Sequence, residues 1–439
     1  MKLRISALLL AAAVLLPAVP ADAAGTGITV TVREGYQCDY GVDIPFTPSP
    51  RTDSYTFALY EGNGTSGSPE VSAEVTVPSA GTVHLPLRYD VGGPSTWTLS
   101  VTAHVRPGRE AFDRESTATK VFTTAPTCGC PAGTEGAFYA GDGSERSPYR
   151  IGTPWQLQHL NHTRHLAAGQ HFRQTADLDF SSFGNWTPIG NATAAFTGNY
   201  DGDGYVISNL SCVQNGLDLE GLFGLVGPAK IERMGIVDSQ FIENKSTGTQ
   251  LCMGAFIGQS SDTTSLDQCY IKNCTISAPY ASTLVRVGGL VGQSLGAISD
   301  CYVVDSSVTG SGREDDSFHV IGGGLLGTSW THLTTAPRTS RSYTLSTAVS
   351  RFSTSTMGVF CGATLVGSVD SSCFFTPTAG LNLGTGWNGS EEGLFSATQL
   401  MSEAEFGNQS NFTAKGWDFS SVWRMDAALG YPVLRAFDR

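Results

Sequence analysis

A short glycine-bounded block that recurs at a nearly constant interval constrains the fold of this chain more than any other feature. The block places a few mostly apolar residues between glycines, and it occurs five times between residues 221 and 362. Its closing glycines are separated by 34, 34, 35 and 35 residues. A fixed period of this length indicates stacked repeats. The closing glycines are Gly224, Gly258, Gly292, Gly327 and Gly362.

A second apolar strip follows each glycine block at a similar offset. Each repeat therefore holds two or three short strands and has no room for a long helix. One repeat cannot bury its apolar face alone, so the repeats must stack. The sequence predicts an all-β fold whose larger part is a parallel β-helix, with glycines at the corners, where φ is positive or the backbones approach closely. The strips are residues 231–237, 266–271, 298–303, 340–345 and 369–375.

Short helical caps are expected at both ends of the stack, because a solenoid needs polar end caps for solubility. Thr153 and Pro154 are typical of a helix start, and the apolar stripe that follows predicts one helix over 154–168. A second helix is expected over 396–406, with Ser396 as its N-cap. The segment from Trp423 to Leu434 is expected to form a final closing strand.

The amino terminus has the pattern of a secretory signal peptide. A basic start and an apolar run up to Leu16 are followed by Ala21-Asp-Ala23, a small-residue cleavage pattern. Residues 1–24 are therefore predicted to be removed, leaving no membrane insertion after cleavage and a secreted or cell-surface location. Alternating strands separated by turns predict a β-sandwich over 25–126, residues 127–150 read as a linker, and the β-helix domain covers 151–439.

Charge and composition exclude several function classes. The chain carries a formal net charge of −13 and no basic cluster, which argues against nucleic acid and anionic membranes as partners. Its 40% hydrophobic residues are too many for a disordered chain. Ten cysteines in an exported protein indicate disulfide chemistry.

Several motifs together resemble the GLUG-motif family of bacterial exported and surface proteins, over about residues 133–439. They are the segment from Phe196 to Leu210, the Gly-Leu-Phe-Gly and Gly-Gly-Leu-Val-Gly repeats, residues 149–151, residues 176–180 and residues 185–190. Members include adhesin-like proteins and non-catalytic portions of some immunoglobulin A peptidases. The resemblance implies a right-handed β-helix with no fixed chemistry.

Residues 25–126 more weakly resemble the pilin-type sandwich domains of Gram-positive surface proteins. The similar segments are residues 55–61, 85–89, 96–99 and 112–122. Such domains often carry an internal Lys–Asn isopeptide bond. The first strand, Gly25 to Tyr40, contains no lysine, so we expect the crosslink to be absent here. Cys38, paired with Cys128 or Cys130, could tie the same two ends instead.

No catalytic, cofactor or metal site is predicted. Asp201 and Asp203 begin like a calcium loop, but the later ligands are missing. On one continuous helix, His159, His162 and His165 would not share a face, so a surface role is expected for them. Neither a nucleophile elbow nor a zinc-protease motif occurs in the sequence.

A β-helix carbohydrate-active enzyme, either a glycosidase or a polysaccharide lyase, is the alternative that stays open. Such an enzyme needs paired carboxylates on an exposed sheet. Several aspartates fall near equivalent strip positions, where turn roles are the competing interpretation. Three aromatic residues could form a glycan platform or simply pack: Trp330, Trp387 and Tyr302. The aspartates are Asp238, Asp267, Asp300, Asp305 and Asp370.

The sequence therefore favours an extracellular, adhesin-like binding or structural module over an enzyme. Its possible ligands are a surface glycan or a protein. Aligning the second strips places Met234, Cys269, Cys301, Ser342 and Cys373 at one position. If that position faces inward, Cys269, Cys301 and Cys373 are stacked in the core as small apolar fillers. Their spacing does not favour disulfides between neighbouring repeats.

Overall fold

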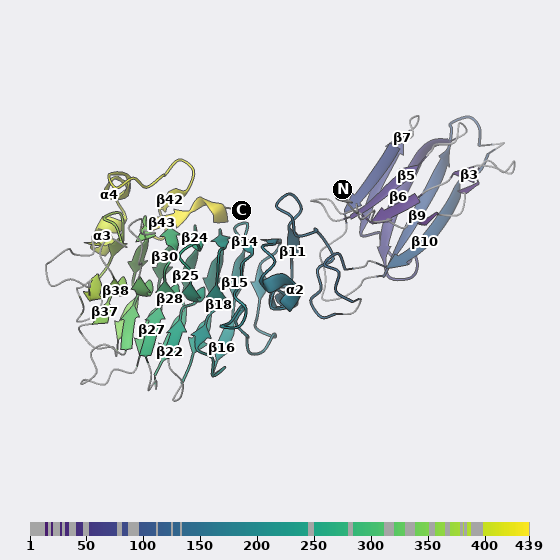
Figure 1. Ribbon diagram of the computed structural model, residues 1–439. Helices are drawn as coiled ribbons and strands as arrows, with labels where there is room; N and C mark the ends of the chain where they lie inside the picture. Colours follow the sequence, from purple (N-terminus) through teal and green to yellow (C-terminus); the bar gives the residue numbers. More distant parts are fainter. Residues whose placement is uncertain are drawn as a thin grey trace, which may run out of the picture. The chain divides into compact units, whose positions relative to one another are not determined.

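The computed structural model divides into two compact units, Met1–Arg150 and Ile151–Arg439 (Figure 1). Each unit is almost entirely β-structure. The structure describes residues 52–76, 81–86, 96–110, 113–123, 126–131, 134–244, 250–279, 284–310, 320–329, 339–350, 356–364, 369–377, 381, 384–387 and 398–438, together with short strand backbones between residues 14 and 46.

The described residues of the first unit form two four-stranded antiparallel sheets and a short two-stranded one. The two larger sheets follow the orders β1-β4-β5-β8 and β10-β9-β6-β7. Most of the segments that the sequence predicts to be strands coincide with these strands. The observed strands are mostly longer than the predicted runs of alternating residues. The strands are β1 (Val14–Leu15), β2 (Val19–Pro20), β3 (Gly27–Ile28), β4 (Thr31–Glu34), β5 (Gly41–Phe46), β6 (Thr52–Glu61), β7 (Val71–Thr76), β8 (Gly81–Pro86), β9 (Thr96–Val105) and β10 (Ser116–Thr123).

One core joins the two antiparallel sheets of this unit. Ile44 of β5 and Leu85 of β8 are buried in the same cluster as Phe57 of β6, Trp97 of β9 and Phe122 of β10. Because alternate side chains of each strand point to the same face, the two sheets bury those faces against each other. Cys38 lies outside the described residues, so its predicted pairing with Cys128 or Cys130 stays a prediction.

The second unit begins with two short helices where the sequence predicts one. Helix α1 (Pro154–His159) has Thr153 as its N-cap, whose hydroxyl accepts a hydrogen bond from Gln156 N at 3.2 Å. The chain then breaks, and α2 (Thr163–Leu166) starts after His162, whose side chain caps it. At the break, the Asn161 amide binds Pro188 O at 2.8 Å and Gly190 N at 3.0 Å. These side-chain bonds compete with helix continuation.

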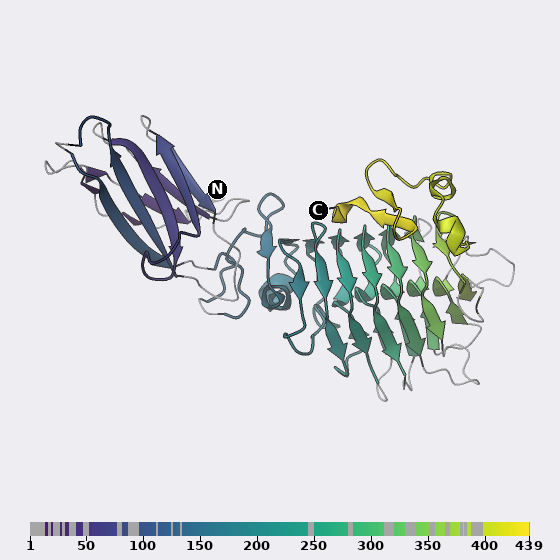
Figure 2. The same ribbon diagram turned by 180° about the vertical axis from the view of Figure 1, so that it is seen from behind.

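Five parallel sheets form the stacked part of the described second unit (Figures 1 and 2). Each complete repeat contributes one strand to each sheet in a fixed order, and each strand pairs with its equivalent in the next repeat. Sheet 1 contains β11 (Tyr149–Ile151), β12 (His171–Gln174), β14 (Asn199–Asp201), β19 (Lys230–Glu232), β24 (Ser265–Asp267), β29 (Ala297–Ser299) and β34 (Thr339–Ser340). Sheet 2 contains β13 (Leu178–Asp179), β15 (Val206–Ser208), β20 (Gly235–Val237), β25 (Tyr270–Lys272), β30 (Tyr302–Val304), β35 (Tyr343–Leu345), β39 (Phe374–Phe375) and β41 (Gln399–Leu400).

The other three sheets follow the same rule. Sheet 3 contains β16 (Ser211–Val213), β21 (Gln240–Ile242), β26 (Thr275–Ala278), β31 (Ser307–Gly310) and β36 (Ala348–Ser350). Sheet 4 contains β17 (Leu219–Glu220), β22 (Gln250–Met253), β27 (Leu284–Gly288), β32 (Val320–Gly323) and β37 (Met357–Gly358). Sheet 5 contains β18 (Phe223–Val226), β23 (Ile257–Ser260), β28 (Val291–Ser294), β33 (Leu326–Ser329), β38 (Cys361–Thr364) and β40 (Thr385–Trp387).

The register of the sheets explains why the sequence repeats. In sheet 2, Ile207 pairs with Ile236, Ile236 with Ile271 and Ile271 with Val303, and all four side chains are buried. Equivalent apolar residues therefore lie directly above one another between the sheets. A shift of one residue in any strand would turn this apolar row outward, so the register is strongly specified.

Of the two roles predicted for the repeated glycines, positive φ or close backbone approach, the five closing glycines show close backbone approach. A Cβ atom added at Gly327 would lie 2.4 Å from Gly292 O and 2.8 Å from Val287 N. None of the five closing glycines has a positive φ. The left-handed corners are instead formed mostly by Asn, Asp, Arg and Gln residues.

The carboxyl-terminal segment runs along sheet 2, which differs from the predicted closing strand. It contains α3 (Glu403–Phe406), α4 (Gln409–Thr413), the antiparallel pair β42 (Trp423–Asp426) and β43 (Tyr431–Leu434), and the 3₁₀ turn η2 (Arg435–Phe437). The N-cap of α3 is Ser402 instead of the predicted Ser396, which lies outside the described residues. In both views this yellow segment lies along one side of the stack (Figures 1 and 2).

Within the described residues, no helix combines the length and the apolar character needed to cross a membrane.

Candidate functional site

The corner between sheets 2 and 3 carries one polar residue with a left-handed backbone in each of five successive repeats. Their φ angles lie between 48° and 57°. Asn and Asp tolerate this conformation better than other non-glycine residues, because their short polar side chains can bond locally. The sequence therefore places them at these corners for a backbone reason. The five are Asn209, Asp238, Asn273, Asp305 and Ser346.

Amide and carboxylate side chains alternate along this corner and bond in pairs. The Nδ2 atom of Asn209 donates to Oδ1 of Asp179 at 2.8 Å, and Nδ2 of Asn273 donates to Oδ1 of Asp238 at 2.6 Å. The bond to Asn209 is the main cause of the lowered pKa of Asp179. Alternation of donor and acceptor avoids like charges on neighbouring repeats, which lie about 4.8 Å apart.

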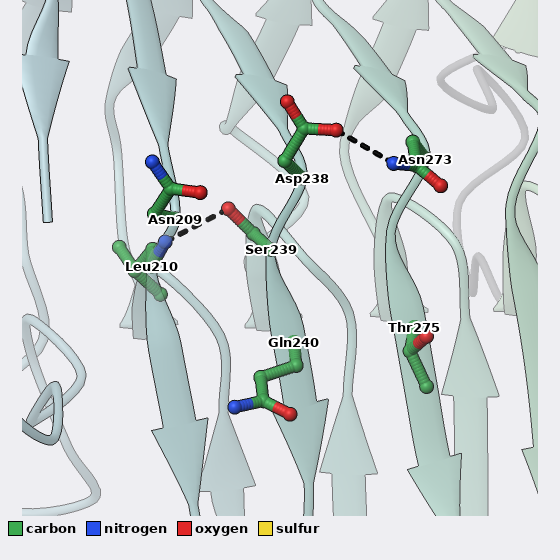
Figure 3. Close-up of a pocket in the computed structure, with 7 residues that line it drawn as sticks. All are labelled: Asn209, Leu210, Asp238, Ser239, Gln240, Asn273 and Thr275. Atoms are coloured by element: carbon green, nitrogen blue, oxygen red, sulfur yellow. Dashed lines mark hydrogen bonds between the residues drawn. The ribbon is translucent and has the colours of Figure 1, made fainter. Parts of the chain in front are cut away.

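A shallow pocket of about 380 Å³ lies on this corner (Figure 3). Six of its seven lining residues have polar side chains, so its surface offers amide, hydroxyl and carboxylate groups. Gln240 and Thr275 pair across adjacent strands of sheet 3 and extend the row begun by Asp238 and Asn273. Such a surface can hydrogen-bond a hydroxyl-rich ligand. The lining residues are Asn209, Leu210, Asp238, Ser239, Gln240, Asn273 and Thr275.

The corner between sheets 1 and 2 carries ion pairs. Arg233 binds Asp201 through both Nε and Nη2, and the Nε–Oδ1 distance is 3.0 Å. Arg341 binds Asp300 in the same way, with Nη2–Oδ2 at 2.7 Å. Asp201 also accepts a hydrogen bond from the backbone N of Asp203. The segment that begins like a calcium loop is therefore a turn, and the Arg233–Asp201 pair binds it to the neighbouring repeat.

The aspartates considered for catalysis are engaged in turns and in contacts between repeats. Asp267 accepts a 2.6 Å hydrogen bond from Ser299 Oγ. Asp370 accepts from the backbone N and the hydroxyl of Ser372. Asp300 is buried, whereas Asp305 is exposed at a left-handed corner. These contacts match the turn interpretation that the sequence left open.

Tyr302 does not form an exposed platform. Its ring stacks between Tyr270 at 4.8 Å and Tyr343 at 5.0 Å, with interplanar angles of 9° and 1°. Trp423 of the carboxyl-terminal segment covers this row, and Phe437 packs edge-on against Tyr270. Trp330 and the side chain of Trp387 lie outside the described residues. Tyr302 is therefore a packing residue.

Sequence reasoning missed a buried acidic cluster at the turn between sheets 3 and 4. Glu220 is 2% exposed and accepts hydrogen bonds from Cys212 Sγ at 3.2 Å and Asn215 Nδ2 at 3.1 Å. Burial raises the pKa of Glu220 to about 7. Glu243 is also buried and accepts from Gly216 N at 2.8 Å. No spacing motif marks this cluster, because its members come from different strands and loops.

The aligned strip position faces inward in every repeat. Met234, Cys269, Cys301, Ser342 and Cys373 all have zero exposure. The Sγ atoms of Cys269 and Cys301 each donate to a backbone carbonyl two residues earlier, at 3.2 and 3.1 Å. No disulfide joins any two of the seven described cysteines of the second unit. Burial also raises the pKa of the Cys301 and Cys373 thiols, which keeps them protonated.

The three histidines of the amino-terminal helices lie together, contrary to expectation. Their ring centroids are 5.1 to 5.9 Å apart. His159 and His165 are buried, and His162 is exposed. The prediction assumed one continuous helix, whereas the break after α1 rotates α2 and brings the rings to one side.

Two relatives share part of this sequence, while no family model matches it. Halomucin of Haloquadratum walsbyi is 32% identical over 216 residues, which cover 46% of this chain and 2% of halomucin. A protein of Evansella cellulosilytica that is provisionally named a Gly-rich membrane protein is 29% identical over 129 residues, or 28% of this chain and 14% of that protein. The chain therefore matches only a small share of the length of either relative.

The chain is also similar to a solved structure. It is the crystal structure of a Bacteroides ovatus protein that is provisionally named an immunoglobulin A1 protease. The two chains are 20% identical, and the match covers 68% of this chain and 95% of the other, with a TM-score of 0.41.

Proposed function

We propose that this protein is an exported cell-surface binding module of the adhesin-like kind. In this proposal a β-sandwich domain of pilin type precedes a right-handed parallel β-helix of GLUG type. The fixed order of sheets 1 to 5 in every complete repeat, with each strand paired to the next repeat, supports the β-helix. The signal-peptide pattern of residues 1–24 supports export.

The observation that carries the binding role is the polar corner between sheets 2 and 3. Three successive repeats each place a polar residue at this corner, and all three line the shallow pocket: Asn209, Asp238 and Asn273. Because the same backbone geometry repeats, the corner presents hydrogen-bonding groups at a regular spacing of about 4.8 Å. A linear, hydroxyl-rich ligand suits such a row, and we propose a glycan chain as the ligand.

A catalytic role lacks comparable support. Glu220 has a raised pKa of about 7, as a general acid requires, but its side chain is 2% exposed and faces Cys212 and Asn215. A polysaccharide cannot reach a carboxyl in that position without local unfolding. The five candidate aspartates are turn or contact residues.

A polysaccharide panel tests the proposal. The purified protein is passed over immobilised glycans, and both retention and release of new chain ends are measured. Retention without cleavage is expected. Cleavage of any glycan would favour the carbohydrate-active enzyme instead, and failure to be retained on every glycan would overturn the glycan-binding role.

A matched pair of double variants locates the binding surface. Gln240 and Thr275 are in-register neighbours on sheet 3, and Lys230 and Ser265 are in-register neighbours of the same two repeats on sheet 1. The double substitution Q240A/T275A should weaken retention at least about tenfold, corresponding to the loss of one or two hydrogen bonds. The control K230A/S265A should bind like the wild type. Equal retention of both variants would exclude the pocket as the binding surface.

A further inference from the structure

The histidine cluster of the amino-terminal helices has the geometry of a metal site. For two imidazoles on one tetrahedral Zn²⁺, Zn–N bonds of about 2.1 Å place the ring centres about 5 Å apart. The His159–His165 centroids are 5.1 Å apart and the His159–His162 centroids 5.4 Å apart. A ring nitrogen of His159 and one of His165 lie within 4.8 Å of each other. His159 is the last residue of α1, His162 lies at the break, and His165 belongs to α2.

A hydrogen bond to a neighbouring side chain sets the tautomer of one of these rings. The Nδ1 atom of His165 donates to Oε1 of Gln170 at 2.7 Å. This bond leaves the lone pair on Nε2, the nitrogen that can then bind a metal. Metal-binding histidines commonly donate their other ring N–H to a carbonyl or carboxylate, which fixes the ring orientation. Gln170 would have that role here.

Burial separates this cluster from a chance gathering of surface histidines. His165 has zero exposure and His159 is 6% exposed. Phe172 packs edge-on against His165 at 6.4 Å, so one side of the ring is held by the apolar core. The His165 ring is therefore held in place before any ion binds.

We propose that His159 and His165 bind a divalent transition-metal ion such as Zn²⁺ through one ring nitrogen each. Gln170 is the residue that positions His165. Two imidazoles supply two of the four ligand positions of a tetrahedral zinc ion.

Metal binding is measured on the whole protein, purified without a polyhistidine tag and stripped with a chelator. Zinc content, zinc affinity and the visible spectrum after Co²⁺ loading are recorded. The wild type should take up a single equivalent of zinc and give the intense visible bands of tetrahedral Co²⁺. The double variant H159N/H165N should bind zinc at least about 100-fold more weakly. The control H171N alters a partly buried histidine of β12 outside the cluster and should bind like the wild type.

Further measurements keep the inference falsifiable if the double variant folds poorly. The single variant H165Q keeps a hydrogen-bonding side chain, and circular dichroism reports its folding. Zinc should raise the melting temperature of the wild type but not that of H165Q. Zinc binding or thermal stabilisation that is the same in H159N/H165N, H165Q and the wild type would overturn the inference, as would octahedral Co²⁺ spectra typical of adventitious binding.

Discussion

The indole Nε1 of Trp423 donates a 2.8 Å hydrogen bond to Oδ1 of Asp300, although 123 residues separate them in the sequence. Asp300 is buried at a left-handed corner and also binds Arg341. The bond therefore ties the carboxyl-terminal segment to the polar interior of the corner between sheets 1 and 2. Tyr343 adds a second tie, because its hydroxyl donates to Pro432 O at 2.6 Å.

Replacing Trp423 with phenylalanine should detach this segment partially. W423F keeps the aromatic packing but leaves a buried carboxylate oxygen of Asp300 without one donor, and hydrogen bonds to charged groups contribute about 2 kcal/mol. Urea unfolding should show a loss of that size, with faster proteolysis of residues 398–438. W155F is the control, since Trp155 is 42% exposed. If the two variants are equally stable, the Trp423–Asp300 bond is not a stabilising contact.

Gly327 should not tolerate a side chain. The Cβ of G327A would lie 2.4 Å from the backbone oxygen of Gly292, which belongs to the preceding repeat and cannot move independently. We expect a loss of about 3 kcal/mol, typical of overpacking. G407A is the comparison, because its Cβ would lie 3.4 Å from Ala404 O, an ordinary contact. Chemical unfolding measures both; a G327A midpoint within error of G407A would contradict the close-approach role.

Glu220 should make stability fall as the pH rises. Burial raises its pKa to about 7 in the folded protein, against 4.5 for an ordinary glutamate. The unfolded chain therefore loses this proton first, so stability falls between about pH 4.5 and 7 and is level above that range. The difference of about 2.5 pH units corresponds to about 3 kcal/mol.

The variant E220Q isolates this effect, because glutamine has a similar shape and does not ionise. Its unfolding midpoint should vary less with pH than that of the wild type, and it should be the more stable protein at pH 8. E403Q, at an exposed position of α3, should keep the wild-type profile. Parallel urea titrations from pH 4.5 to 8.5 test this, and coincident curves for E220Q and the wild type would refute it.

The hydrogen bond between Asn273 and Asp238 can be tested by changing the charge at position 273. N273D keeps a residue that tolerates the left-handed corner but places a second carboxylate beside Asp238, where the present side-chain distance is 2.6 Å. Stability should drop by up to about 1 kcal/mol at neutral pH and low salt. The loss should shrink as salt is added, because salt screens the repulsion between exposed charges.

The swapped double variant D238N/N273D should restore only part of the stability at neutral pH, since an amide again faces a carboxylate between positions 238 and 273, whereas the carboxylate at position 273 faces Asp305 of the next repeat. Denaturant midpoints of the two single variants and the double variant form a mutant cycle that measures the coupling. Independent, additive effects would show that the two side chains do not interact in solution.

The packing order of the repeats could be predicted from the sequence, but the path of the carboxyl terminus could not. Glycine blocks and apolar strips repeat because each position meets its equivalent in the next repeat, as Ile236 meets Ile271. The outward-facing tyrosines could have indicated that another segment covers this side of sheet 2. Tyr270, Tyr302 and Tyr343 each follow an inward residue of the aligned strip, so they point away from the core and need an aromatic-rich cover. Trp423 and Phe437 supply it.

The candidate sites were less predictable. The corner residues Asn209 and Asp238 follow from turn chemistry, but their pairing with Asn273 and Asp179 depends on which repeats are adjacent. The histidine cluster was assigned to a surface because a continuous helix separates i and i+6 on its circumference. The Asn161 side chain interrupts that helix by bonding to residues 188 and 190, and no local pattern reports such a contact.

The sequence by itself determined the period of the repeat and the inward row of residues from Met234 to Cys373, because local alternation and glycine spacing recur along the chain. The prediction of two or three strands in each repeat was wrong, since each complete repeat has five. Tertiary structure alone decided the roles of Asp300, Glu220 and His165. Each of these groups is polar and buried, and its charge and partners are set by residues that arrive from other strands or loops. Periodicity indicates which face of a strand a side chain lies on, whereas the desolvation and hydrogen bonding of a polar group depend on the strands and loops that the fold packs around it.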